Sequence, residues 1–276
     1  MQLSFVKMQG AGNQIVVVDR RGSDRTPPSA ELLRQLGSSE RGPGFDQLMW
    51  LGAPRDASMT ASYRVFNADG SEVEQCGNGV RCVALLLAQQ QPGERRFMFE
   101  SPAGPIEARV LDDDRVAVNM GPPVFDPRRV PFVADSEAVS YTLEVDGDTF
   151  EVAVLSMGNP HCVLDVDDVG MAEVARLGPL IEHHPRFPAC VNVGFMRRRD
   201  RSHIELRVHE RGVGETLACG TGACAAVVAG RRRGQLDEQV TVELPGGQLM
   251  VSWPGDAEPV WLTGSAEVIC EGTIDL

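Results

Sequence analysis

Apolar and polar residues alternate along several short segments of the chain, and a period of two predicts β-strands. The alternation is clearest in segment 204–208, where Glu205 and Arg207 separate apolar residues. Segment 64–66 is predicted to be a second strand. Segment 143–152 carries strand-like residues on both sides of Asp146-Gly147, a dipeptide typical of a tight hairpin turn. Similar turns are expected at 112–114 and 245–247.

Two apolar, alanine-rich segments predict helices instead, and they cover residues 80–87 and 223–229. The second helix is expected to end at 231–234, where three arginines precede a glycine, because cations in a last turn followed by glycine are typical of a helix end. These arginines, and those at 197–199, are interpreted as solvated. The fold class is therefore predicted to be α+β, rich in strands, with one buried helix in each half of the chain.

The sequence repeats itself once, at a constant offset of 143 residues. The matched features are Arg64-Val65 with Arg207-Val208, Glu72 with Glu215, and Cys76-Gly77-x-Gly79 with Cys219-Gly220-x-Gly222. Weaker similarities pair Gly12-Asn13 with Gly158-Asn159, and Gln47 with Asn192. Two pseudo-symmetric domains are expected, one over residues 1–120 and the other over 121–265, with a linker rich in Pro and Gly near 121–131.

Composition excludes several classes of protein. The chain has 276 residues, of which 42% are apolar, and this is typical of a globular protein. Its net charge of −13 argues against a nucleic-acid partner and against a basic membrane-surface protein. Because no apolar segment approaches the about 18 residues of a membrane span, and no signal core begins the chain, a cytoplasmic protein is expected.

The basic residues and the cysteines limit the chemistry further. Only one of the 26 basic residues, Lys7, is a lysine, which argues against a pyridoxal-phosphate enzyme. The seven cysteines contain no CxxC pair, so neither a disulfide framework nor a structural zinc site is favoured. No metal and no cofactor are expected.

The repeated cysteines, Cys76 and Cys219, each stand at the start of a predicted helix. The positive field there is expected to lower the thiol pKa and favour the thiolate. The amides of residues 77–79 and 220–222 can hold an anion such as a carboxylate. A single cysteine of this kind is most often structural. Two related by a repeat suggest thiols that face each other across a cleft between the domains.

This arrangement is suited to a two-base epimerase. One thiolate removes a proton from one face of a carbon, and the opposite thiol returns a proton to the other face. The two helix ends would bind the carboxylate on that carbon and stabilise the charge that develops on it. Such a reaction needs no cofactor.

Both cysteine segments resemble the signature segments of the diaminopimelate epimerase family. They are Glu72-x-x-x-Cys76-Gly77-Asn78-Gly79-Val80-Arg81-Cys82 and Gly214-Glu215-Thr216-x-Ala218-Cys219-Gly220-Thr221-Gly222-Ala223. The resemblance extends over nearly the whole chain, through Gly10-Ala11-Gly12-Asn13, Gly44-Phe45-Asp46-Gln47, Phe66-Asn67-Ala68-Asp69-Gly70-Ser71, Gly158-Asn159-Pro160-His161 and Glu210-Arg211-Gly212.

The resemblance implies a cofactor-independent isomerase that interconverts LL- and meso-2,6-diaminopimelate in lysine and cell-wall biosynthesis. It implies that Cys76 and Cys219 are the acid/base pair and that His161 and Glu210 assist proton movement. Further positions match substrate-binding residues of the family: Asn13, Gln47, Asn67, Gly77, Asn78, Asn159, Asn192, Arg211, Gly220 and Thr221. It also implies that about residues 266–276 return to complete the first domain, and that the protein is a homodimer.

Some positions depart from the family's usual pattern. Gln14 follows Asn13 where the family usually has Asp, and His209 precedes Glu210 where it usually has Tyr. Two other functions stay open at this point. One is a racemase or epimerase of another amino acid on the same fold. If Arg211 binds a second carboxylate, amino acids with only one carboxylate should react poorly, and this disfavours that function. The other is a thiol redox or binding protein.

Overall fold

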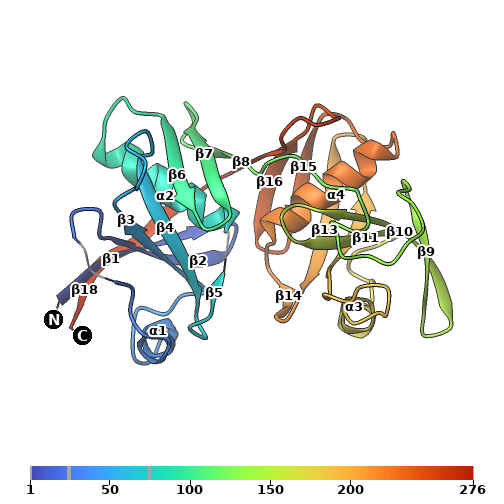
Figure 1. The fold of residues 1–276 in the computed structure, drawn as a ribbon, viewed down its shortest axis with the longest axis horizontal. Coiled ribbons are helices and arrows are strands. Elements are labelled where there is room, and N and C mark those ends of the chain that lie inside the picture. The colour runs from blue at the N-terminus through green and yellow to red at the C-terminus, as the bar shows by residue number, and fades with distance from the viewer. Residues whose placement is uncertain (1, 24–25, 74–75, 276) are drawn as a thin grey trace. The chain divides into compact units, whose positions relative to one another are not determined.

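A computed structural model describes residues 2–23, 26–73 and 76–275 (Figure 1). The chain folds into two compact units. Unit 1 comprises residues 1–119 and 263–276, and unit 2 comprises residues 120–262. Within the described ranges, every helix falls short of the length and apolar character needed to cross a bilayer.

Unit 1 is built on a sheet in which strands follow the order β18-β1-β2-β3-β4, continued by β6, β7 and β8, with β5 added beside β4. The pairs β2–β3 and β4–β6 are parallel and the others are antiparallel. The strands are β1 (Gln2–Gly10), β2 (Asn13–Asp19), β3 (Gln47–Gly52), β4 (Ala61–Asn67), β5 (Glu72–Val73), β6 (Arg96–Ser101), β7 (Gly104–Val110), β8 (Val116–Asn119) and β18 (Glu267–Asp275).

Unit 2 repeats this pattern strand by strand. Its order is β9-β10-β11-β12-β13, continued by β15 and β16, with β14 beside β13, and the parallel pairs are β11–β12 and β13–β15. The strands are β9 (Tyr141–Val145), β10 (Asp148–Ser156), β11 (Pro160–Asp165), β12 (Asn192–Arg198), β13 (His203–Glu210), β14 (Gly214–Thr216), β15 (Gln239–Leu244) and β16 (Gly247–Ser252), and β17 (Trp261–Gly264) spans the boundary of the units. The repeat in the sequence is therefore a repeat of topology, and the predicted strand-rich α+β class is confirmed.

Each unit contains one long helix that is buried against its strands, as predicted. Helix α2 (Gly77–Gln90) contacts β1, β2, β3, β7 and β8, and α4 (Gly220–Arg232) contacts β10 to β13, β15 and β16 (Figure 1). Both helices begin directly after the repeated cysteine. The end of α4 is also as predicted, because Gly234 follows it with a left-handed φ of 72°.

Each unit also has a second, shorter helix that the sequence did not predict. Helix α1 (Ala30–Gly37) buries only Leu33 and Leu36, and its N-cap Ser29 accepts a hydrogen bond from the Leu32 amide. Helix α3 (Val174–Glu182) contains Pro179 in its interior. An eight-residue amphipathic helix and a helix interrupted by proline both give weak periodic signals.

The short helices cover the face of each sheet that the long helices leave open. In unit 1, Leu48 and Trp50 of β3 join the apolar cluster of α1, while Met49 between them faces the start of α2. In unit 2, the corresponding cluster of α3 includes Val193 and Phe195 of β12. Strands β3 and β12 are therefore buried on both faces, and this makes them a firm support for polar residues at their ends.

The predicted hairpin turns are confirmed. Asp146 and Gly147 join β9 to β10 with φ values of 53° and 87°, as a turn with two left-handed positions requires. Residues 111–115 join β7 to β8, and Pro245-Gly246 lie between β15 and β16.

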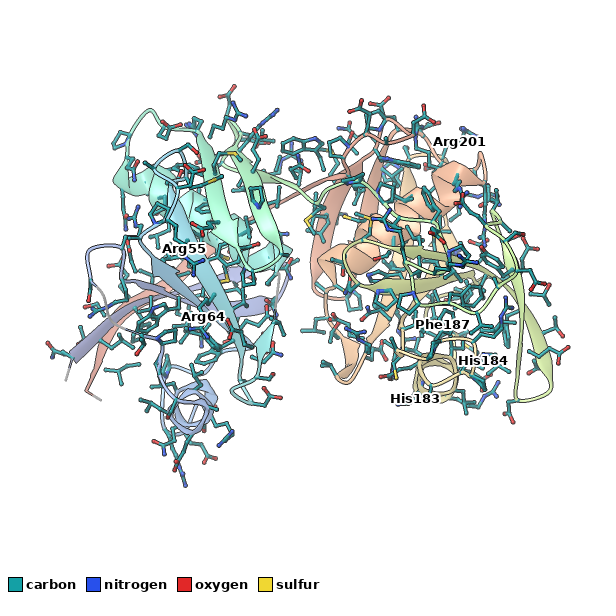
Figure 2. All side chains as sticks on the ribbon, in the orientation of Figure 1. Arg55, Arg64, His183, His184, Phe187 and Arg201 are labelled. Carbon is teal, nitrogen blue, oxygen red and sulfur yellow. The ribbon has the colours of Figure 1, made fainter. Side chains whose placement is uncertain are left out.

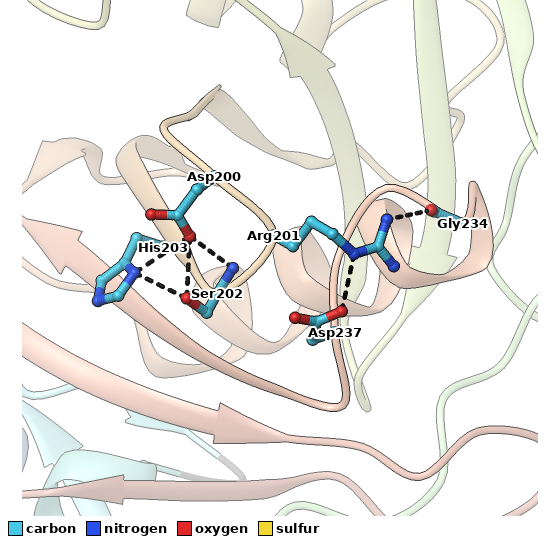
Figure 3. Close-up of polar contacts among 6 residues, drawn as sticks. All are labelled: Asp200, Arg201, Ser202, His203, Gly234 and Asp237. Atoms are coloured by element: carbon cyan, nitrogen blue, oxygen red, sulfur yellow. Dashed lines mark hydrogen bonds and ion pairs between the residues drawn. The ribbon is translucent and has the colours of Figure 1, made fainter.

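The arginine-rich loop between β12 and β13 is tied into its own unit. Arg197 and Arg199 form ion pairs with Glu205, and Arg201 donates to Asp237 and to the Gly234 carbonyl (Figure 3). The Ser202 amide and hydroxyl, with His203, lower the pKa of the exposed Asp200 to about 2. These contacts agree with the interpretation of Arg197 and Arg199 as surface charges, and they add an acidic partner that the sequence did not predict. The same interpretation was wrong for Arg233 at the end of α4, because its side chain is only 8% exposed and pairs with Asp165.

Candidate active site

The polar residues of unit 1 gather at one edge of its sheet because of strand direction. Asn13 begins β2, Gln47 begins the parallel strand β3, and Asn67 ends the antiparallel strand β4. Gln47 lies opposite Asn67 in the register, and its side-chain amide donates to Asn67 Oδ1 at 3.0 Å. Asn67 in turn donates to Ser71 Oγ at 3.1 Å. Asn13 Nδ2 donates to Asp46, the residue before β3, at 3.4 Å.

Cys76 is the N-cap of α2, and its thiol sulfur accepts a hydrogen bond from the Gly79 amide at 3.2 Å. The half-buried sulfur therefore stands where a helix end stabilises negative charge. Gly79 allows the helix to start close to β3, since a Cβ at this position would lie 2.5 Å from Met49 Sδ. The amides of Gly77 and Asn78 belong to the first helical turn, which has no acceptors within the helix. They are suited to hold a carboxylate.

Unit 2 presents the equivalent edge with different side chains. Asn159 precedes β11, His161 lies in β11 opposite Asn192 at the start of β12, and Glu210 ends β13. The register of β12 with β13 places Asn192 and Glu210 where Gln47 and Asn67 stand in unit 1. Cys219 is the N-cap of α4, as Cys76 is of α2.

Cys219 differs from Cys76 in its partner. Its Sγ is 3.1 Å from Glu210 Oε2, to which it donates, and the Thr221 hydroxyl lies 3.6 Å from the same sulfur. The other oxygen of Glu210 accepts a hydrogen bond of 2.6 Å from the hydroxyl of Thr216. Glu210 is thus held between a thiol and a hydroxyl.

The expectation of a lowered thiol pKa is wrong for Cys219. Burial raises the pKa of this thiol well above its ordinary value, and the neighbouring Glu210 carboxylate raises it further, while Thr221 opposes the shift. These two effects outweigh the helix end, because Cys219 is 4% exposed and its sulfur faces a carboxylate. Cys219 is therefore a protonated thiol near pH 7.

His161 is connected to Cys219 through other side chains. Its Nε2 lies 3.0 Å from Asn159 Oδ1, and Asn159 Nδ2 donates to Thr221 Oγ1 at 3.3 Å. Burial, together with the charge of Arg211, lowers the pKa of His161 to about 3. The imidazole is therefore neutral near pH 7, with one ring nitrogen that donates a hydrogen bond and one that accepts.

Asn192 fixes the turn that carries Arg211. Its Nδ2 donates to the Pro160 carbonyl at 2.9 Å, and its Oδ1 accepts from the Arg211 amide at 3.0 Å. The exposed Arg211 side chain donates to the Ala189 carbonyl at 3.1 Å. Its planar guanidinium has further donors that suit a carboxylate.

Three positions in this arrangement were not given a role from the sequence. Thr216 is the clearest, since only the β13–β14 hairpin brings it to Glu210. The other two are the arginines of the repeat. Arg64, labelled in Figure 2, lies in β4. It binds Glu72 in a two-point ion pair with both bonds at 2.6 Å, and Arg207 binds Glu215 through two bonds of 2.6 and 2.9 Å. One ion pair connects β4 to β5 and the other connects β13 to β14, each just before a repeated cysteine. The constant spacing of Arg, Glu and Cys in the two halves was the sequence signal for these ion pairs.

Solved structures share this fold at low sequence identity. The chain is similar to a hydroxyproline epimerase from Agrobacterium vitis, with a TM-score of 0.70 and 18% identity over 99% of this chain and 92% of that one. It is also similar to a Bacillus anthracis phenazine biosynthesis protein of the PhzF family, with a TM-score of 0.71 and 15% identity over the full length of both.

Comparison of sequences is more specific. The family model described as "Diaminopimelate epimerase" matches residues 5–125 and 153–269. Proteins named diaminopimelate epimerase from Laribacter hongkongensis and Pseudomonas entomophila are 54% and 50% identical to this chain, each over 100% of both sequences. The chain therefore belongs to the diaminopimelate epimerase family.

Proposed function

We propose that this enzyme interconverts LL- and meso-2,6-diaminopimelate by moving the proton of one α-carbon, with Cys76 and Cys219 as the two acid/base groups. Membership of the family supports the substrate and the class of reaction. The observation that carries the mechanism is the repeated site itself. Two cysteines cap equivalent helices, and each lies beside a sheet edge lined with amides or a carboxylate.

The contacts of the two sulfurs favour opposite protonation states at the start. Cys76 accepts an amide hydrogen bond and is suited to be the thiolate, whereas the buried Cys219 donates to Glu210. In this reaction direction the Cys76 thiolate takes the α-proton from one face. The electron pair left on the carbon then takes the Cys219 proton on the other face. The reverse reaction starts from the opposite state, in which Glu210 or His161 can help to return the proton.

The substrate is proposed to contact the site residues of both units. Its reacting carboxylate would meet the amides of residues 77–78 and 220–221, which stabilise the negative charge that develops during proton removal. Asn67, Asn192 and Arg211 would bind the far carboxylate and amine. Asn13, Gln47 and Asn159 would line the remainder.

Neither a metal nor an organic cofactor is required by this mechanism, because the thiols move the proton and the amides stabilise the charge. We further propose that the enzyme is cytoplasmic and forms a homodimer, as the resemblance implies. Light scattering of the purified protein tests the second point, since a monomer mass at assay concentration would contradict it.

The test of the proposed function is an exchange experiment. Reduced, metal-free enzyme is incubated with LL-diaminopimelate in D2O, and meso product and α-deuterium are followed by chiral chromatography and mass spectrometry. We expect meso product carrying solvent deuterium, and its loss in both Cys76→Ala and Cys219→Ala. Reaction of one-ended amino acids at a comparable rate would contradict the proposed role of Arg211, and absence of exchange in the wild-type enzyme would overturn the function.

A further inference from the structure

A buried, hydrogen-bonded pair of Glu182 and His209, which the mechanism does not use, lies directly beside the Glu210 turn. Glu182, the last residue of α3, and His209, the residue before Glu210, are only 5% and 7% exposed. His209 Nε2 lies 2.8 Å from Glu182 Oε2. The other carboxylate oxygen accepts the Gly212 amide at 2.7 Å. One side chain of α3 therefore binds the chain on both sides of residues 210–211.

The surroundings of the pair are shaped to hold it. Helix α3 packs on β12, β13 and β14, and its Gly178 leaves room for the imidazole, since a Cβ there would lie 2.6 Å from His209 Cγ. Gly212 adopts a left-handed φ of 73°, which favours glycine in the turn. The turn is thus held at three residues. His209 and Gly212 contact Glu182, and the Arg211 amide donates to Asn192.

The hydrogen bonds to Glu182 favour its ionised form. Burial raises the pKa of this carboxyl, but hydrogen bonds from His209 and the Gly212 amide outweigh burial and lower the pKa below its ordinary value. His183 follows the helix, with its Nδ1 4.0 Å from Glu182 Oε2 (Figure 2), and Cys190 has its sulfur within 4.8 Å of both. Glu215 of β14 lies opposite His209 in the strand register and forms an ion pair with Arg207.

We propose that Glu182 and His209 are a positioning pair, which holds the 210–212 turn so that the Glu210 carboxylate stays against Cys219 and Arg211 stays at the site. Neither residue touches the reacting atoms. The part that concerns turnover rests on the proposed function, whereas the part that concerns Glu210 and Cys219 is a property of unit 2 alone.

The test compares two substitutions with a matched control on the same helix. Glu182→Ala removes both hydrogen bonds, while Glu182→Gln keeps a carbonyl oxygen for the Gly212 amide. The control, Glu173→Gln, removes an exposed ion pair with Arg176. Two quantities are measured on folded protein: kcat and KM of the exchange reaction, and the pH midpoint of Cys219 alkylation by iodoacetamide, followed by peptide mapping.

We expect Glu182→Ala to lower kcat by about 100-fold, as misplacement of an oriented group does, and to change KM less. The alkylation midpoint of Cys219 should move to lower pH, because Glu210 no longer raises the thiol pKa. Glu182→Gln should recover much of kcat, and Glu173→Gln should stay within about twofold of wild type, as for an exposed ion pair.

A Glu182→Ala enzyme with wild-type kcat and an unchanged Cys219 midpoint would overturn the proposal. If that variant does not fold, His209→Phe decides in the same way, since an unchanged midpoint and kcat in that variant would overturn the proposal as well. Absence of exchange in the wild-type enzyme would refute the proposed function instead. The alkylation midpoint would then still decide whether the pair positions Glu210.

Discussion

Replacement of Thr216 by valine tests whether the Glu210 carboxylate must be held in place. The Thr216 hydroxyl donates to Glu210 Oε1 at 2.6 Å, while the other oxygen faces Cys219 at 3.1 Å. A hydrogen bond to a charged group contributes about 1.5–3 kcal/mol. If this is lost mainly in the transition state, kcat/KM should fall about 10- to 100-fold.

The repeat supplies the reason why this variant should fold. Val73 in unit 1 occupies the position equivalent to Thr216, since Val65 pairs with Val73 as Val208 pairs with Thr216. Valine is therefore already compatible with this strand. The assay is the initial rate of meso product formation, with Thr216→Ser as the control that keeps the hydroxyl. Equal kcat/KM in the valine and serine variants would refute the argument, whether that value equals the wild-type value or is lower.

Two further predictions concern stability. Gly79→Ala should destabilise the protein by about 1–3 kcal/mol, as overpacking does, because the new Cβ would lie 2.5 Å from Met49 Sδ; urea unfolding checks this, with Gly22→Ala as a control at an open position. The lowered pKa of Glu182 contributes stability that is present above the ordinary carboxyl pKa and is lost as pH falls through the native value. Thermal unfolding from pH 7 to 3 should therefore show a shallower acid limb for Glu182→Gln than for wild type, and parallel curves would contradict this.

The elements that the sequence predicted well are those with strong local signals. The two long helices contain apolar, alanine-rich segments, and each begins directly after the cysteine of a Cys-Gly-x-Gly segment whose glycines allow a close approach to the sheet. The hairpin at Asp146-Gly147 follows from residues that tolerate left-handed φ. Helices α1 and α3 were missed because most of their stability comes from packing a few apolar side chains on a sheet, and that contact is not visible in eight or nine residues.

The chemistry of the second cysteine could not be predicted from its segment alone. A helix start by itself implies a lowered thiol pKa. Burial or a nearby negative charge can outweigh this effect and raise the pKa. Glu210 precedes Cys219 by nine residues, and the β13–β14 hairpin folds it back onto the sulfur. The strand register also brings in Thr216. Long-range placement thus reverses the direction of the shift, and no local pattern contains that information.

The two units share a scaffold and differ in the few side chains that decide protonation. Equivalent positions hold Asn67 in unit 1 and Glu210 in unit 2, and only the latter carries a charge. Duplication of one domain would by itself give two identical thiols, with no reason for one to hold a proton while the other accepts it. A two-base reaction needs that difference. In the proposed mechanism one carboxylate, placed at only one of two equivalent strand ends, would supply it, while the backbone that presents both cysteines stays the same.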